Sequence, residues 1–154
     1  MIKEIDGNRF EEMRSLEQNL TFVETSREFA RRNVEFGLHQ MKTLKLLNYD
    51  GIYTNLGLLL SEQCKHTIKV AVFQGTDQSV FKDRREFSGS LFKQLNEVYE
   101  YIDIHNQTQS TFNKLLRIDT RDYPEDALRE ALLNLMVHRD YGFQASALIS
   151  IYED

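Results

Sequence analysis

The sequence ALREALLNLMVHRDYG, residues 127–142, decides how the C-terminal part of this chain is expected to fold. Most of its residues are apolar, which predicts a helix that packs closely against other elements. Glu130, Asn134 and His138 interrupt the apolar residues at intervals of four. Because an α-helix turns by about 100° per residue, these three residues form a shallow spiral on one side. An unpaired buried carboxylate is costly, so the row is expected to face solvent, a ligand pocket or a buried partner.

Two apolar segments on either side of this helix predict strands. Apolar residues alternate with others in HTIKVAVFQG, residues 66–75, and SALISIYED at residues 146–154 is also strand-like. SVFKDRREFS, residues 79–88, predicts a further strand, joined to the first by a hairpin at Thr76, Asp77 and Gln78. With the helices described next, these strands predict a mixed α/β (α+β) fold.

The longest predicted helix covers residues 88–105. Its apolar stripe has the spacing of one helical face, and Ser88 or Ser90 is the expected cap; the stripe consists of Leu91, Leu95, Val98 and Ile102. The polar residues 106–113 are expected to form a loop. Residues 114–124 are expected to be extended, and Pro124 fits the first turn of the next helix.

The N-terminal third of the chain predicts a small helical subdomain. Residues 1–18 are polar and weakly patterned, so they are interpreted as a lead-in segment or linker. Three short helices are expected after it, the first capped by Thr25 or Ser26 and the third by Thr54 or Asn55. Helices of this length separated by turns resemble a winged-helix unit; the alternative is that they pack beside a sheet.

Composition excludes some classes of protein and favours the cytoplasm. The net charge is −5 and hydrophobic residues make up 41% of the chain, as in ordinary globular proteins. The N-terminus lacks the apolar segment of a secretory signal. With Cys64 as the only cysteine, an internal disulfide is impossible. A cysteine–histidine nucleophile formed with His66 is conceivable, but coincidence is the better interpretation because nothing else completes a triad.

Two pairs of arginines are candidates for contacts with nucleic acid. Arg31 and Arg32 lie on the first predicted helix, and Arg84 and Arg85 lie on the second strand. Because the whole chain is acidic, DNA contact would require a local patch. The alternative for both pairs is a solvated or salt-bridged surface, since acidic residues are interleaved with them.

Several segments together resemble one bacterial family of transcriptional regulators and RecG-related ATP-dependent DNA helicases. Members join a Schlafen AlbA-type domain to a histidine-kinase-like (GHKL-type) ATPase domain and a winged helix. The resemblance covers about residues 20–154, and ALREALLNLMVHRDY is its most specific part. The other matching segments are YTNLGLLLSEQ (53–63), IKVAVFQGTD (68–77), FKDRREFSGSLFKQL (81–95) and LRIDTRDYP (116–124).

The resemblance implies a role for the polar row of residues 130–138. In GHKL-type ATPases the helix with the pattern Glu-x-x-x-Asn is the N-box. Glu130 matches the carboxylate that orients or activates the attacking water, and Asn134 matches the amide that holds magnesium over the ATP phosphates. His138 and Arg139 would approach a phosphate. The expected cofactors are therefore ATP and Mg²⁺, and the expected partners are DNA and further copies of the chain, as a homodimer or higher oligomer.

The chain also departs from the family pattern. The Asp-x-Gly-x-Gly box and the glycine-rich lid are missing, and no glycine follows Gly142. We therefore expect a central fragment that is inactive alone, with a lead-in at 1–18, a helical subdomain at 19–66, a strand pair and long helix at 67–109, and the N-box half of the ATPase at 110–154. The alternatives are a non-catalytic interaction or dimerisation module and a helicase-related accessory region; the chain has no Walker A motif.

Overall fold

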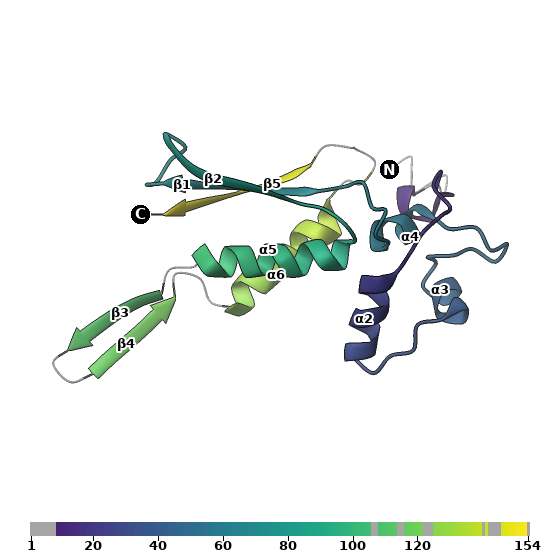
Figure 1. Cartoon of the computed structure of the whole chain (residues 1–154), viewed down its shortest axis with the longest axis horizontal. Helices are drawn as coiled ribbons and strands as arrows, with labels where there is room; N and C mark the ends of the chain where they lie inside the picture. The colour runs from purple at the N-terminus through teal and green to yellow at the C-terminus, as the bar shows by residue number, and fades with distance from the viewer. Residues whose placement is uncertain are drawn as a thin grey trace. The chain divides into compact units, whose positions relative to one another are not determined.

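A computed structural model describes residues 9–105, 108–113, 116–121, 125–139, 141 and 146–153. The chain forms two compact units, and each is built from segments distant in sequence (Figure 1). Unit 1 contains residues 1–67, 87–94 and 140–146, and unit 2 contains residues 68–86, 95–139 and 147–154.

Unit 2 is organised around a mixed three-stranded sheet with the order β2-β1-β5. Strands β1 (Ile68–Gln74) and β5 (Ala147–Glu153) are parallel, with Ile68 opposite Ala147 and Gln74 opposite Glu153. Strand β2 (Val80–Phe87) neighbours β1 after a connection too short for a parallel crossover, so the two are antiparallel. These strands confirm the three predicted from sequence, and the mixed α+β class is confirmed with them.

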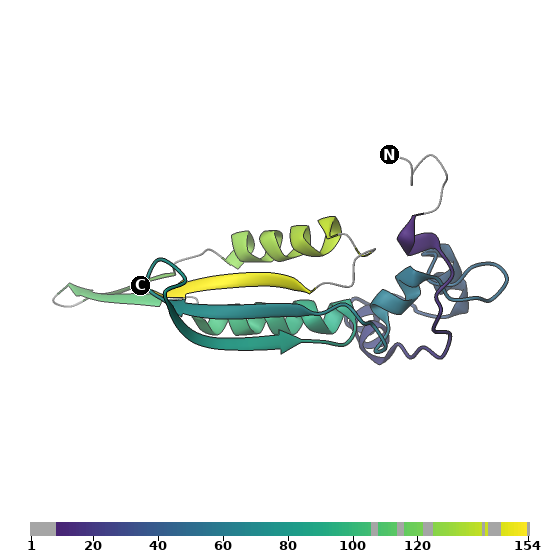
Figure 2. The same cartoon turned by 90° about the horizontal axis from the view of Figure 1, so that it is seen from above.

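Two helices lie on one face of this sheet, and α6 runs alongside β5 (Figures 1 and 2). They are α5 (Leu91–His105) and α6 (Glu125–His138). The apolar stripe predicted for α5 is buried at Val98 and Ile102, which are 0% and 7% exposed. The expected cap is Ser90, whose Oγ accepts a hydrogen bond from the Lys93 amide at 3.2 Å.

A polar hairpin in unit 2 corrects one sequence prediction. Strands β3 (Thr108–Asn113) and β4 (Leu116–Arg121) pair antiparallel, with Thr108 opposite Arg121. The prediction of a loop was therefore wrong for residues 108–113, while residues 106–107 and Pro124 lie outside the described residues. The segment has almost no apolar side chains to alternate, so its strand came from pairing with β4 rather than from a recognisable pattern.

Unit 1 contains the predicted short helices. They are α2 (Val23–Arg31), α3 (Leu38–Thr43) and α4 (Asn55–Leu60), preceded by the 3-10 turn η1 (Phe10–Glu12). Thr54 caps α4 as expected, because its Oγ accepts a hydrogen bond from the Gly57 amide at 3.2 Å. The buried side chains Leu46, Leu47, Leu59 and Cys64 belong to this unit.

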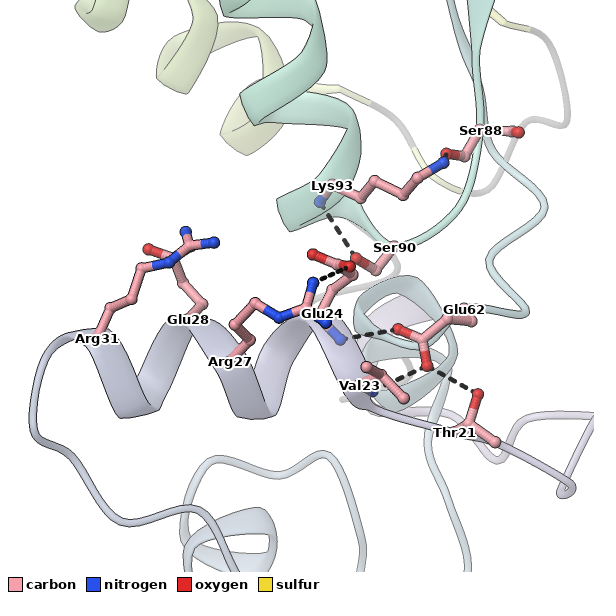
Figure 3. A network of polar contacts seen from close by, with 10 residues as sticks. All are labelled: Thr21, Val23, Glu24, Arg27, Glu28, Arg31, Glu62, Ser88, Ser90 and Lys93. Atoms are coloured by element: carbon pink, nitrogen blue, oxygen red, sulfur yellow. Dashed lines mark hydrogen bonds and ion pairs between the residues drawn. The ribbon is translucent and has the colours of Figure 1, made fainter.

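The N-terminus of α2 is capped by a residue distant in sequence (Figure 3). The predicted cap at Thr25 or Ser26 is wrong, because Thr25 is buried inside the helix and its hydroxyl donates to the Leu60 carbonyl at 2.7 Å. Glu62 caps the helix instead. Its carboxylate accepts hydrogen bonds from the amides of Val23 at 2.9 Å and Glu24 at 3.1 Å.

Candidate functional site

Glu130 and Asn134 lie one turn apart on α6, as the sequence predicted from their spacing, and both are exposed. Among the described residues no hydrogen bond or ion pair engages either side chain. His138 is the last residue of α6, and the structure does not describe its side chain. Arg139 follows the helix and is half-buried. The structure thus brings the first two predicted residues together on a side of α6 that a ligand can reach.

The apolar side of α6 borders a pocket inside unit 2. The pocket has a volume of about 450 Å³, is open to solvent on one side, and is bordered by the end of α5, by α6 and by residues 148–152 of β5. From α6 it is lined by Ala127, Leu128, Ala131, Leu132 and Leu135. Glu130 and Asn134 are not among the lining residues. At about 100° per residue, Glu130 and Asn134 lie roughly 60° and 20° from Ala127 around the helix, on the side of Ala127 that faces away from the other lining residues. They are therefore next to the pocket but outside it.

A buried carboxylate joins three elements of unit 2 beside this pocket. Glu153, on β5, is 6% exposed; it forms an ion pair with Lys82 on β2 and a hydrogen bond with Nδ1 of His105 on α5, the latter at 3.2 Å. The hydrogen bond from Lys82, together with that from His105, holds the pKa of Glu153 below its usual value despite burial. His105 also lines the pocket. This cluster leaves no local pattern in the sequence, because His105 and Lys82 lie 48 and 71 residues from Glu153.

The candidate arginines of β2 differ in their surroundings. Both are exposed, and Arg85 lies over the ring of Tyr101, with its guanidinium carbon 5.2 Å from the ring centre. The Tyr101 hydroxyl donates to Asp83 at 2.9 Å. Burial and this hydrogen bond raise the pKa of Tyr101 to about 12. Both arginines are therefore on the surface, and Arg85 additionally contacts an aromatic ring.

The candidate arginines at the C-terminal end of α2 both pair with one acidic residue. Arg31 and Arg32 form ion pairs with Glu28 at 2.9 and 3.2 Å. Both guanidinium groups remain largely exposed, at 56% and 71% of the side chain. Such surface pairs contribute little to stability, so a phosphate would compete with Glu28 at modest cost.

Cys64 and His66 belong to the buried core of unit 1. The Cys64 thiol donates to the His66 carbonyl oxygen at 3.6 Å, and His66 Nε2 lies 2.9 Å from the carbonyl oxygen of Tyr141. Cys64 is only 8% exposed and packs with Leu59 and Tyr141. These contacts agree with the interpretation of the cysteine–histidine spacing as coincidence.

The described residues offer oxygen ligands rather than a complete metal site. Within them, no group of three or more histidine, cysteine, aspartate or glutamate side chains is placed to hold a metal ion. The oxygens of Glu130 and Asn134 are of the type that Mg²⁺ accepts, and this ion commonly takes its remaining ligands from phosphates and water. The pair therefore fits magnesium only together with a phosphate ligand.

Comparison with known proteins identifies a similar fold. No family model matches the chain, and no curated protein sequence matches it significantly. The structure is similar to the crystal structure of the DIP2311 protein from Corynebacterium diphtheriae, with a TM-score of 0.73 and 19% sequence identity over 94% of this chain. The chain spans about a third of that protein, 31% of its length. At this identity the similarity shows the fold alone. In the described part of the chain, no helix has the length and apolar character to span a membrane.

Proposed function

We propose that this chain supplies the N-box helix of a GHKL-type ATPase within a longer bacterial transcriptional regulator, in which ATP binding is linked to DNA binding. The observation that carries the proposal is the exposure of Glu130 and Asn134 one turn apart on α6. Side chains at positions i and i+4 of a helix reach the same volume, so a carboxylate and an amide can act there on one ligand.

Each residue of the pair has a distinct chemical task. The Glu130 carboxylate accepts a hydrogen bond from a water molecule and orients it toward the terminal phosphate, and the Asn134 amide oxygen ligates the cation. When bound, Mg²⁺ offsets the negative charge that develops on the phosphates. Leu132 and Met136, 4% and 9% exposed, anchor the opposite side of α6. This anchoring fixes the positions of both polar groups, as catalysis requires.

The DNA-binding part of the proposal rests on the longer protein. The net charge of this chain is −5, and Arg31 and Arg32 are paired with Glu28. We therefore place most DNA contacts outside the 154 residues, with the exposed Arg84 and Arg85 as the candidates within them. ATP and Mg²⁺ bound at α6 would control the arrangement of the protein on DNA or its assembly into dimers.

The proposal is tested by nucleotide binding and turnover in the longer protein. Glu130→Gln is expected to reduce ATP hydrolysis by about 100-fold or more while leaving Mg-ATP binding nearly unchanged. Asn134→Ala is expected to weaken Mg-dependent binding. Glu125→Gln is the matched control, because it changes an exposed carboxylate on another side of the same helix. Absence of any Mg-ATP-dependent shift in melting temperature would overturn the proposal. The 154-residue chain alone is expected to show no turnover and weak or no binding.

A second candidate is a non-catalytic module for dimerisation. It is favoured by β5, an outer strand of the sheet on which Leu148 and Tyr152 are 63% and 41% exposed. An outer strand with exposed apolar side chains is prone to pair with another chain. A dimer seen by light scattering that is disrupted by Leu148→Lys, in a protein without nucleotide binding, would favour this candidate over the first.

A further inference from the structure

The pocket of unit 2 has the size and lining of a site for a small organic molecule. Its volume of about 450 Å³ lies within the range of about 300–1,000 Å³ that is common for such sites. Aliphatic side chains dominate the lining, with Ile102 from α5 and Leu132 and Leu135 from α6. No lysine or arginine lines it within the described residues. A ligand that carries phosphates therefore has no cationic partner in this pocket.

His105 and Tyr152 are the titratable groups that line the pocket in the described residues, and Glu153 orients the His105 ring through a hydrogen bond. Its Nδ1 lies 3.2 Å from Oε2 of Glu153. An ionised carboxylate only accepts hydrogen bonds, so Nδ1 carries the proton, and in the neutral imidazole Nε2 is then an acceptor. Lys82 binds the other oxygen of Glu153, which fixes the carboxylate in place.

We propose that this pocket binds a small, mostly hydrocarbon molecule that carries one hydroxyl group, such as an alkylphenol or a long-chain alcohol. The hydrocarbon part lies among the aliphatic side chains of α5, α6 and β5, and the hydroxyl donates a hydrogen bond to Nε2 of His105. Because no lysine or arginine lines the pocket within the described residues, an uncharged hydroxyl compound fits the lining better than an anion does. This site goes beyond the proposed ATPase function and uses different residues, because Glu130 and Asn134 do not line the pocket.

The test compares two probes of nearly equal shape, 4-butylphenol and butylbenzene, binding to the full 154-residue chain in calorimetry or NMR titrations. We expect saturable binding of 4-butylphenol and an affinity for butylbenzene about threefold to tenfold lower, as the loss of one hydrogen bond predicts. His105→Phe is expected to abolish this difference while both probes still bind. Equal affinity of the two probes for the unchanged chain would overturn the proposal.

A second variant tests the location without removing a buried residue. Ala131 is an exposed pocket residue, so Ala131→Phe fills the pocket and is expected to abolish binding of 4-butylphenol. Leu133→Phe is the matched control, since Leu133 is 41% exposed and does not line the pocket, and it is expected to leave binding unchanged. Unchanged binding in Ala131→Phe, or displacement of 4-butylphenol by Mg-ATP or adenosine, would contradict the proposal. Failure of the ATPase proposal would alter none of these results.

Discussion

Gly57 lies inside α4 although glycine costs a helix about 1 kcal/mol relative to alanine. The reason is a close approach of two backbones. A Cβ atom at this position would lie 2.6 Å from the carbonyl oxygen of Leu46, which is closer than such atoms approach. That carbonyl is also held by the Thr54 amide at 3.0 Å, so it is not free to move away. The residue is therefore required by packing in spite of its low helix propensity.

Gly57→Ala is expected to lower the free energy of unfolding by about 1–3 kcal/mol, because the steric cost exceeds the gain in helix propensity. Urea denaturation measures the change. Ser26→Ala is the control, since Ser26 is an exposed position in α2 where a smaller gain in propensity comes without a clash. The control is expected to leave stability equal or slightly higher. An increase in stability for Gly57→Ala would show that α4 and the chain at Leu46 separate easily.

At the scale of single elements, α2 depends on a cap from another part of the chain. Burial alone would raise the pKa of Glu62, but hydrogen bonds from the Val23 and Glu24 amides and the Thr21 hydroxyl lower it below its usual value near 4.5. A carboxyl with a lowered pKa stabilises the folded state above its unfolded pKa. This stabilisation is lost as the pH falls from about 4.5 through the lower folded value.

Glu62→Gln is therefore expected to cost about 1 kcal/mol at pH 7, the usual contribution of a helix cap. The difference in melting temperature from the unchanged chain is expected to shrink on acidification below about pH 4.5, where the carboxyl of the unchanged chain is protonated. Thermal denaturation followed by circular dichroism at pH 7 and at lower pH measures both effects. Glu100→Gln, an exposed acid on α5, should show neither. A difference that is the same at every pH would mean that charge plays no part in the cap.

Elements whose apolar residues follow a regular spacing were predictable from the sequence. Features that depend on contacts between residues far apart in the chain were not. The alternation in β1 and the stripe on α5 record burial on one face, so both were found. The start of α2 was misplaced because its cap, Glu62, lies 38 residues from Glu24. Strand β3 was missed because pairing with β4 creates it. For the candidate site, helical spacing brought Glu130 and Asn134 together, but no spacing relates His105 to Glu153 across 48 residues.

At the scale of the whole molecule, each unit is completed by segments far away in sequence. Gln94 is 0% exposed in unit 1, where its side-chain amide donates to the carbonyl oxygens of His66 at 2.6 Å and Gly89 at 2.7 Å. Tyr141 is 5% exposed and packs in the same unit with Leu59 and Cys64. The N-terminal 67 residues therefore do not contain the complete core of unit 1.

A fragment of residues 1–67 is accordingly expected to lack a cooperative thermal transition, because it loses both Gln94 and Tyr141 from the core. The same dependence is measurable without truncation. Tyr141→Ala in the 154-residue chain is expected to lower the free energy of unfolding by about 3 kcal/mol, as for other large core aromatics. Tyr152→Ala is the matched control, and its cost is expected to be smaller because Tyr152 is 41% exposed. Two results together would contradict this expectation: the fragment of residues 1–67 melts as sharply as the 154-residue chain, and the Tyr141→Ala variant is no less stable than the Tyr152→Ala control. They would show that the N-terminal segment folds without the distant residues. The core of unit 1 would then be set by local helices, and the contacts of Gln94 and Tyr141 would follow folding rather than determine it.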